Sequence, residues 1–242
     1  MDFEFDSEDN IKRAKTPSIK VLNDDAKLWI SDQCVEMCKW KGNLVPYSLK
    51  TDKEDVIISR NIIPNPRMLI LQRSFLLKVE TKTDRILRAW IAKESKEKNT
   101  YACVRKYMIL FVDEDNNPLH EVPVQLTANG CFQFDFDQQL CDFRALMTKV
   151  YNGKATFMKN SWYIVCVFVP TFKSMMRGEE SKQKKACITT GYEKPTKDNW
   201  LSLCVGRRTD LANNVYKLYS KTKAPCGAKF GGNENNFWWK RE

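Results

Sequence analysis

The hydrophobic pattern is clearest in the middle of the chain, where it has the period of β-strands. RMLILQRSFLLKVE (67–80) is a nearly continuous apolar run that Ser74 interrupts as a bulge or turn. RILRAWIA (85–92) places alternate residues on opposite faces, which is the period of a strand. TKTD (81–84) supplies a break between the two runs. This stretch therefore predicts strands joined by a hairpin.

A second strand pair is expected after a charged loop at 93–99. YACVRKYMILFVD (101–113) predicts a long strand, and DEDNNP (113–118) is a string of turn-forming residues. HEVPVQLTA (120–128) predicts the next strand, and its Pro123 indicates an edge strand or a bulge.

The period then changes to that of a helix over 134–151, where apolar residues recur every three or four positions. Asp135 or Asp137 can cap the start of this helix, and Asn152–Gly153 supplies a stop signal. The elements expected in the rest of the chain are strands at 17–22, 56–59, 161–174 and 186–195, an ambiguous segment at 28–42, a charged loop at 176–185, a strand or short helix at 199–206 and a helix at 209–221.

This order predicts a β-rich α+β fold, with one helix before the last strand pair and another near the C-terminus. An OB-fold also has a helix between its third and fourth strands, so a decorated OB-like barrel is one solution and a different α+β sheet is the other. We expect a flexible acidic arm at 1–16, one globular domain at 17–222, and a linker with an aromatic tail at 223–242.

Composition and charge narrow the class of function. Of the 242 residues, 43% are hydrophobic, which indicates a globular protein, and the net charge of +10 favours a polyanionic partner. The charge is segregated: residues 61–106 carry eleven bases against four acids, 113–142 carry seven acids and no Lys or Arg, and 171–229 carry thirteen bases against five acids. Differently solvated faces would explain this segregation, and so would a binding groove.

The two basic segments also contain aromatic residues, and cations that follow phosphates beside rings that stack on bases are typical of single-strand binding. We therefore predict a non-enzymatic protein that binds nucleic acid, most readily single-stranded, on a basic, aromatic-lined β surface, without a cofactor. The candidate contacts are Arg85, Arg88, Trp90, Tyr101, Arg105, Lys106, Phe172, Lys173, Arg177, Lys182, Lys184, Lys185 and Tyr192.

Two other functions stay open. The C-terminal FWWKRE offers Phe237, Trp238 and Trp239, whose rings can dock onto the domain or a protein partner, or can stack on bases; docking is favoured, and it would make the chain an interaction module of a larger assembly. The acids at 113–115, 135, 137 and 142 raise the alternative of a metal-dependent nuclease, although turn and helix-terminus positions explain them better.

Catalytic and metal motifs are otherwise missing from the sequence. His120, the single histidine, lies next to Glu121, but no nucleophile motif such as GxSxG accompanies it, so we expect a structural role. Nine cysteines include Cys34 and Cys38 as CxxxC, without a second pair at zinc-site spacing. No catalytic or metal-binding residue is therefore assigned.

The first residues are acidic and do not have the features of a secretory signal, and no apolar run reaches the length of a membrane span. Together with the irregular cysteines, this predicts reduced thiols, no membrane contact and a cytoplasmic location, or the plastid stroma.

The segment from 60 to 150, with PLHEVPVQLTANG at its centre, resembles a family of uncharacterised proteins from cyanobacterial genomes and plasmids. The residues that carry the resemblance are Pro66, Arg67, Pro118, Leu119, His120, Pro123, Gln125, Leu126, Thr127 and Gly130. The resemblance implies no chemistry for any residue; occurrence on plasmids would fit nucleic-acid work.

Overall fold

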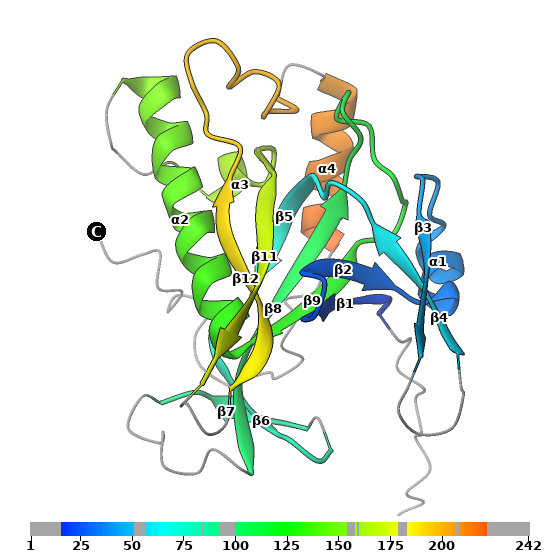
Figure 1. Ribbon diagram of the computed structural model, residues 1–242. Coiled ribbons are helices and arrows are strands. Elements are labelled where there is room, and N and C mark those ends of the chain that lie inside the picture. Colours follow the sequence, from blue (N-terminus) through cyan, green and yellow to red (C-terminus); the bar gives the residue numbers. More distant parts are fainter. Residues whose placement is uncertain are drawn as a thin grey trace, which may run out of the picture.

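The computed structural model describes residues 16–50, 57–83, 85–91, 100–153, 158, 160–178, 183–206 and 209–221 (Figure 1). Nearly all of the predicted acidic arm lies outside these residues, as do the charged loop at 93–99 and the predicted tail at 223–242.

In the described part of the chain, ten strands form the larger sheet. Its hydrogen-bonded order is β10-β5-β8-β9-β1-β2-β4-β3, and the β6–β7 hairpin joins it through β8. The strands are β1 (Ser18–Leu22), β2 (Lys27–Ile30), β3 (Val45–Lys50), β4 (Ile57–Ile63), β5 (Met68–Arg73), β6 (Leu77–Glu80), β7 (Ile86–Ala89), β8 (Tyr101–Phe111), β9 (Val124–Asn129) and β10 (Val167–Phe168). β1 joins β9 as a parallel pair, with Ser18 opposite Gln125, and the other described pairs are antiparallel.

Four helices and a separate hairpin complete the described fold. The hairpin, formed by β11 (Pro170–Arg177) and β12 (Lys184–Tyr192), lies beside α2 in front of the sheet (Figure 1). The helices are α1 (Asp32–Cys38), α2 (Gly130–Asn152), α3 (Asn160–Tyr163) and α4 (Thr209–Lys221).

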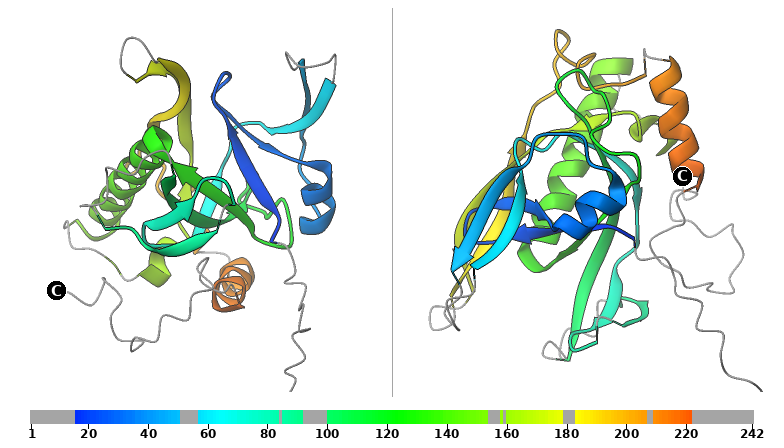
Figure 2. Two further views of the ribbon diagram at one scale, coloured as in Figure 1. Left: turned by 90° about the horizontal axis from the view of Figure 1, so that it is seen from below. Right: turned by 90° about the vertical axis from the view of Figure 1, so that its right-hand side faces the viewer.

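The central strands β5 and β8 are buried on both faces, which explains their unbroken apolar sequences. Alternate residues of a strand point to opposite faces. One set packs with α2 and includes Ile70, Tyr107 and Phe111, whereas the other packs with α4 and includes Leu69 and Leu110. The two helices therefore lie on different sides of these strands (Figure 2).

The predicted break at Ser74 is confirmed, and its hydroxyl group explains how the sheet tolerates it. Ser74 N donates to Lys106 O at 2.8 Å, and Lys106 N donates to the Ser74 hydroxyl oxygen at 2.9 Å. The side chain thus supplies the acceptor that a backbone carbonyl would otherwise provide, and β6 can begin three residues later against the same strand.

Helix α2 is confirmed but begins four residues before its predicted start. Asn129 is the N-cap and makes no side-chain capping bond, while Asp135 and Asp137 lie inside the helix, so their assignment as caps is wrong. Phe132 is 5% exposed, and its burial stabilises an additional helical turn before residue 134, which local helix propensity did not predict. The predicted stop is correct: Gly153 adopts the left-handed conformation with φ 68° and donates to Lys149 O.

The β-rich α+β class is confirmed, as are the helix before the last strand pair and the C-terminal helix. The OB-like barrel is wrong, because the sheet formed by the described residues is open and ends at β10 and β3. The segment 161–174 is not one strand but contains the end of α3, β10 and the start of β11. β9 is not an edge strand: it lies between β8 and β1, and Pro123 precedes it.

Candidate functional site

Three strands at one end of the sheet carry several of the residues predicted to bind nucleic acid. Lys78 of β6 lies opposite Arg88 of β7 and opposite Cys103 of β8. Residues directly opposite each other in antiparallel strands share a face, and so do alternate residues of one strand. Lys78, Arg88, Tyr101 and Arg105 therefore share one face, and these four residues are called the basic strip.

An aromatic ring and a cation are in contact within the basic strip. Lys78 Nζ lies 4.0 Å from the centre of the Tyr101 ring, a cation–π contact, and Lys78 is only 7% exposed. Arg88 and Tyr101 are half-buried, and so is Trp90, whose backbone N donates to Leu76 O at 2.8 Å just beyond the end of β7. The rings are thus held by the sheet while part of their surface meets solvent.

Arg105 at the inner end of the basic strip belongs to a polar cluster around Asp137. Arg73 Nη1 lies 3.3 Å from Asp137 Oδ1, and Arg105 Nη1 lies 3.1 Å from each carboxylate oxygen. The Tyr107 hydroxyl donates to Oδ1 at 2.7 Å and Gln133 Nε2 to Oδ2 at 3.0 Å. These five residues are called the Asp137 cluster.

The Asp137 cluster is largely buried and carries a net positive charge. The side chains of Arg73, Arg105 and Asp137 are 12%, 16% and 16% exposed. Burial, and then the negative charge of Asp137, raise the pKa of Tyr107 well above its usual value, so this hydroxyl stays protonated as a donor. The Asp137 carboxylate therefore fixes Arg105 in place, and Arg105 is less accessible than the sequence suggests.

Further along α2, burial lowers the pKa of Arg144 to about 10.

The remaining predicted contacts are not all on the basic strip. Lys106 follows Arg105 in β8 and points to the opposite face, and Arg85 is exposed just before β7. Exposed cations occupy the β11–β12 hairpin, where Arg177 lies opposite Lys184. The other two exposed cations in the described part of the hairpin are Lys173 and Lys185. Lys182 lies outside the described residues, as do Phe237, Trp238 and Trp239.

Two of the predicted stacking rings are half-buried and pack against the core instead. Phe172 lies 5.8 Å from Phe132 of α2 between ring centres. Tyr192 lies 5.7 Å from Phe143 and 5.9 Å from Phe168. These rings hold the hairpin against α2, so the prediction that they line a surface for bases is not supported by their position.

The sequence reasoning missed a second exposed face that combines rings with cations, on β1, β2, β3 and β4. Trp29 lies opposite Lys20, with Lys20 Nζ 5.5 Å and Arg60 Cζ 4.5 Å from its ring centre. Tyr47 lies opposite Arg60, and Lys27 Nζ is 5.9 Å from the Tyr47 ring. These five residues are called the Trp29 face.

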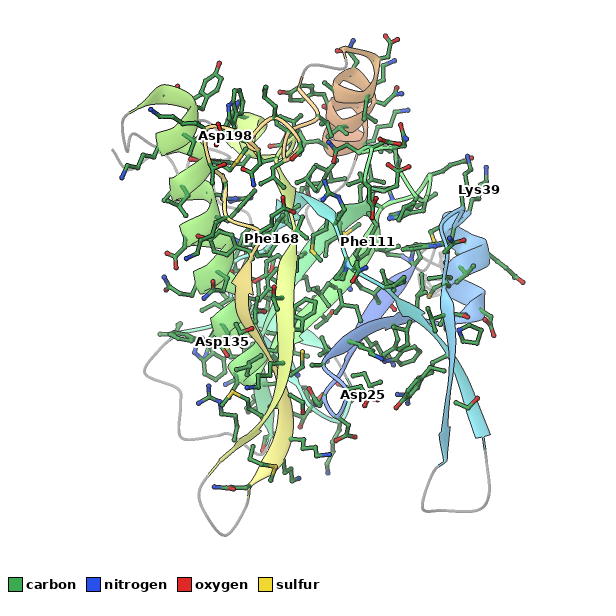
Figure 3. The ribbon with its side chains drawn as sticks, turned by 45° about the horizontal axis from the view of Figure 1, so that its top comes forward. Asp25, Lys39, Phe111, Asp135, Phe168 and Asp198 are labelled. Carbon is green, nitrogen blue, oxygen red and sulfur yellow. The ribbon has the colours of Figure 1, made fainter. Side chains whose placement is uncertain are left out.

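In KLWI (27–30), Lys27 and Trp29 alternate with the apolar residues Leu28 and Ile30, and this strand pattern could have predicted the face. The sequence reasoning left that segment ambiguous between strand and helix, and it did not predict β3 at all. Pro46 lowers the strand propensity of β3, but an edge strand tolerates proline. The Tyr47 hydroxyl also donates to Asp25 in the β1–β2 turn, labelled in Figure 3, so one acid borders this face.

His120 is 1% exposed and both of its ring nitrogens are engaged. Phe111 N donates to Nε2 at 2.8 Å, which leaves Nδ1–H to donate to Val122 O at 2.8 Å. The imidazole stacks on Trp40 with ring centres 5.1 Å apart, and burial lowers its pKa to about 4. His120 is therefore a neutral structural group that ties the 118–122 segment to β8.

Glu121, although adjacent in sequence, forms no pair with His120. It bonds to two lysines at the surface, with Lys39 Nζ 2.8 Å from Oε2 and Lys41 Nζ 3.0 Å from Oε1. The hydrogen bonds from Lys39 and then Lys41 lower its pKa to about 2. Figure 3 shows Phe111, the partner of His120, in the interior and Lys39, the partner of Glu121, at the periphery. The two adjacent residues therefore lie in different environments.

The acidic residues do not assemble into a metal site within the described part of the chain, where no group of three or more His, Cys, Asp or Glu side chains is placed to hold an ion. Asp113 instead bonds to Asn117 in its own turn. None of the helices that the structure describes is long and apolar enough to span a bilayer.

Comparison with known proteins places the chain among viral relatives. The family model described as "Domain of unknown function (DUF5895)" matches residues 14–227. The chain is 38% identical to "Uncharacterized protein 254L" of Invertebrate iridescent virus 6 over 282 residues, which cover 99% of this chain and 80% of that relative. No solved structure matches.

These matches correct the family expected from the sequence. The motif PLHEVPVQLTANG resembled a cyanobacterial and plasmid-borne family, but a match spanning nearly the whole chain points to a virus-associated one. Within this motif His120 and Leu126 are buried in the core, so these two residues stabilise the β8–β9 corner and do not form an exposed site. The chain belongs to the DUF5895 family.

Proposed function

We propose that this protein binds single-stranded nucleic acid across the basic strip. The observation that carries the proposal is the strand register, which brings Lys78, Arg88, Tyr101 and Arg105 onto one face from segments up to 27 residues apart. Phosphates are attracted to such cations, and bases stack on the exposed parts of adjacent rings.

The charge on this face supports a polyanionic ligand. Asp137 is shared by Arg73 and Arg105, so one carboxylate offsets two guanidinium groups. Lys78 and Arg88 add two cations on the same face, and Glu80, which lies opposite Tyr101, adds one acid. A backbone phosphate that approaches this face would therefore meet excess positive charge in partly desolvated surroundings, where ionic attraction is stronger than in bulk water.

The β11–β12 hairpin extends the cationic surface at the same end of the molecule. Its Arg177–Lys184 end points in the same direction as β6 and β7 in Figure 1 and in the right view of Figure 2. A single strand that lies on the basic strip could reach this second group of cations, which suits a ligand that is long and flexible.

The Trp29 face is the competing location for the same activity, because it too has rings beside cations. It is bordered by Asp24 and Asp25 and carries no counterpart of the Asp137 cluster. Each face carries three cations, and the basic strip is preferred because its neighbour Arg73 adds a fourth, against the two acids Asp137 and Glu80. The Trp29 face has its three cations against Asp24 and Asp25, and charge-matched variants of the two faces separate them.

The double substitution Arg85→Ala/Arg88→Ala is expected to weaken binding of a labelled 20-nucleotide oligo(dT) about tenfold at 50 mM salt. Its plot of log affinity against log salt should be less steep by about 1.4, since each lost phosphate contact on a single strand removes roughly 0.7. Fluorescence anisotropy over a salt series measures both quantities, with duplex DNA and oligo(U) as parallel ligands.

Lys20→Ala/Lys27→Ala is the matched control, because it removes two exposed cations from the Trp29 face. It should bind like the unchanged protein. Loss of affinity in this control alone would move the interface to the Trp29 face. Binding by the unchanged protein that is weak and insensitive to salt would refute the proposed function.

Trp90→Leu tests stacking separately from charge. It keeps apolar volume but removes the indole, so affinity for oligo(dT) should fall at least fivefold while the salt slope stays the same. Trp29→Leu should have no such effect. Equal affinities for Trp90→Leu and the unchanged protein would show that Trp90 takes no part in binding.

A further inference from the structure

Cys166 and Cys204 form a cross-strand pair at a defined position of the backbone. The two residues are partners in an antiparallel bridge. Hydrogen bonds lie on either side of them: Val167 N donates to Leu203 O at 2.9 Å, and Val205 N donates to Val165 O at 2.9 Å. The cysteines therefore occupy a non-hydrogen-bonded position, where the Cα atoms are typically about 4.5 Å apart. That separation lies within the range for a disulfide.

The bridge places the two cysteines side by side on neighbouring strands, and their surroundings give the thiols different roles. The Cys166 thiol donates to Trp162 O at 3.5 Å, and the Cys204 sulfur accepts from Gly206 N at 3.4 Å. The contact with Cys166 comes first among the causes that lower the pKa of Cys204 to about 7, whereas burial raises the pKa of Cys166 well above its usual value. Cys204 is half-buried and Cys166 buried, so the more acidic thiol is also the more accessible one.

The other described cysteines lack this arrangement. Cys34 and Cys38 are one helical turn apart on α1, so they do not face each other across a pair of strands. Burial, as the main cause, raises the pKa of Cys38 to about 11. Cys131 and Cys141 are exposed on α2 and lie about three turns apart.

We infer that Cys166 and Cys204 are a redox pair that closes to an intramolecular disulfide by exchange with a small disulfide such as oxidised glutathione. The Cys204 thiolate attacks one glutathione sulfur, which forms a mixed disulfide and releases one glutathione thiolate. Cys166 then loses its proton and attacks the Cys204 sulfur, which releases the second glutathione thiolate. Two cysteine thiols are oxidised, one glutathione disulfide is reduced to two thiols, and the two protons end on glutathione.

The disulfide would lock the segment that leads into α4. Residues 199–206 are connected to the sheet by the hydrogen bonds at the bridge. Tyr216 of α4 is close enough to interact electrostatically with Cys204: burial and then the charge of Cys204 raise the pKa of Tyr216. The covalent link would close a loop of about 40 residues, which stabilises the folded state chiefly by restricting the unfolded chain.

The test incubates the full chain with oxidised glutathione at pH 7.5, blocks remaining thiols with iodoacetamide, and maps the digest by mass spectrometry. The expected result is a linked peptide pair containing Cys166 and Cys204. The melting temperature of the oxidised protein should rise by roughly 5–10 °C, and excess dithiothreitol should reverse the rise.

Single variants distinguish the two roles. Cys166→Ser should trap glutathione on Cys204, whereas Cys204→Ser should leave Cys166 unmodified. The double variant Cys34→Ser/Cys38→Ser should still form the linked peptide. The inference is overturned if glutathione is found on Cys131 or Cys141 while Cys166 and Cys204 stay alkylated, a result that requires no variant to fold.

Discussion

Replacing Asp137 by Asn is expected to lower the free energy of unfolding by about 3 kcal/mol and the melting temperature by roughly 6–12 °C. The substitution keeps the size of the side chain but removes the charge that Arg73 and Arg105 share at 3.1–3.3 Å. Two largely buried guanidinium groups would then lose the carboxylate that they share, and breaking a buried pair on one side costs more than the pair contributes. Urea unfolding followed by circular dichroism measures the change.

Asp142→Asn is the matched control on the same helix. Asp142 is exposed, and its side chain accepts a hydrogen bond from Gln138 Nε2 at 3.0 Å. Its replacement should change stability by less than about 0.5 kcal/mol. A double-mutant cycle with Arg105→Gln would measure the coupling to Asp137, expected at about 1–3 kcal/mol. Equal effects of Asp137→Asn and Asp142→Asn would contradict the role assigned to the cluster.

The stability of the protein is expected to fall as the pH drops from 6.5 towards 4, through His120. Burial gives the folded state a pKa of about 4 against a usual value of 6.5, so the unfolded chain binds the proton more tightly over this interval. The contribution is complete above pH 6.5 and is lost progressively on acidification. The loss amounts to about 1 kcal/mol per pH unit near pH 5.5 and at most about 3 kcal/mol.

His120→Gln provides the comparison, since glutamine does not titrate and the chain has no other histidine. This variant should be less stable at pH 7, because its side chain cannot reproduce both bonds, to Phe111 N and Val122 O, in the same stacked geometry. Its stability should stay nearly constant between pH 5 and 6.5. If the stability of both proteins changed equally with pH between pH 5 and 6.5, His120 would ionise in the folded protein as it does in water.

The sequence was most informative where one physical effect dominated. The apolar runs of β5 and β8, the period of α2 and the turn at Gly153 follow from burial and backbone preference, and these predictions were correct within a few residues. The structural role expected for His120 also agrees with its buried, doubly bonded ring.

The candidate site was harder to predict because exposure depends on which elements pack together. Phe172 and Tyr192 are residue types typical of a binding surface, but both rings pack against aromatic rings of α2. Arg105 has a buried counter-ion 32 residues away that spacing cannot reveal. The Trp29 face was missed because it needs β3, whose proline masks its strand character, and because pairing between distant strands leaves no local signal.

The parallel pairing of β1 with β9 sets the order in which a growing chain can become native. During synthesis the β1–β2–β4–β3 ribbon leaves the ribosome long before its partner strand, because Ser18 must wait for Gln125, about 100 residues later. Until then the side chains of Ile19, Leu28 and Ile30 cannot be buried against the rest of the core. Such delayed, long-range closure slows folding and leaves apolar edges accessible to chaperones or to neighbouring chains. Truncations that end before residue 129 should accordingly yield aggregates rather than a folded N-terminal unit.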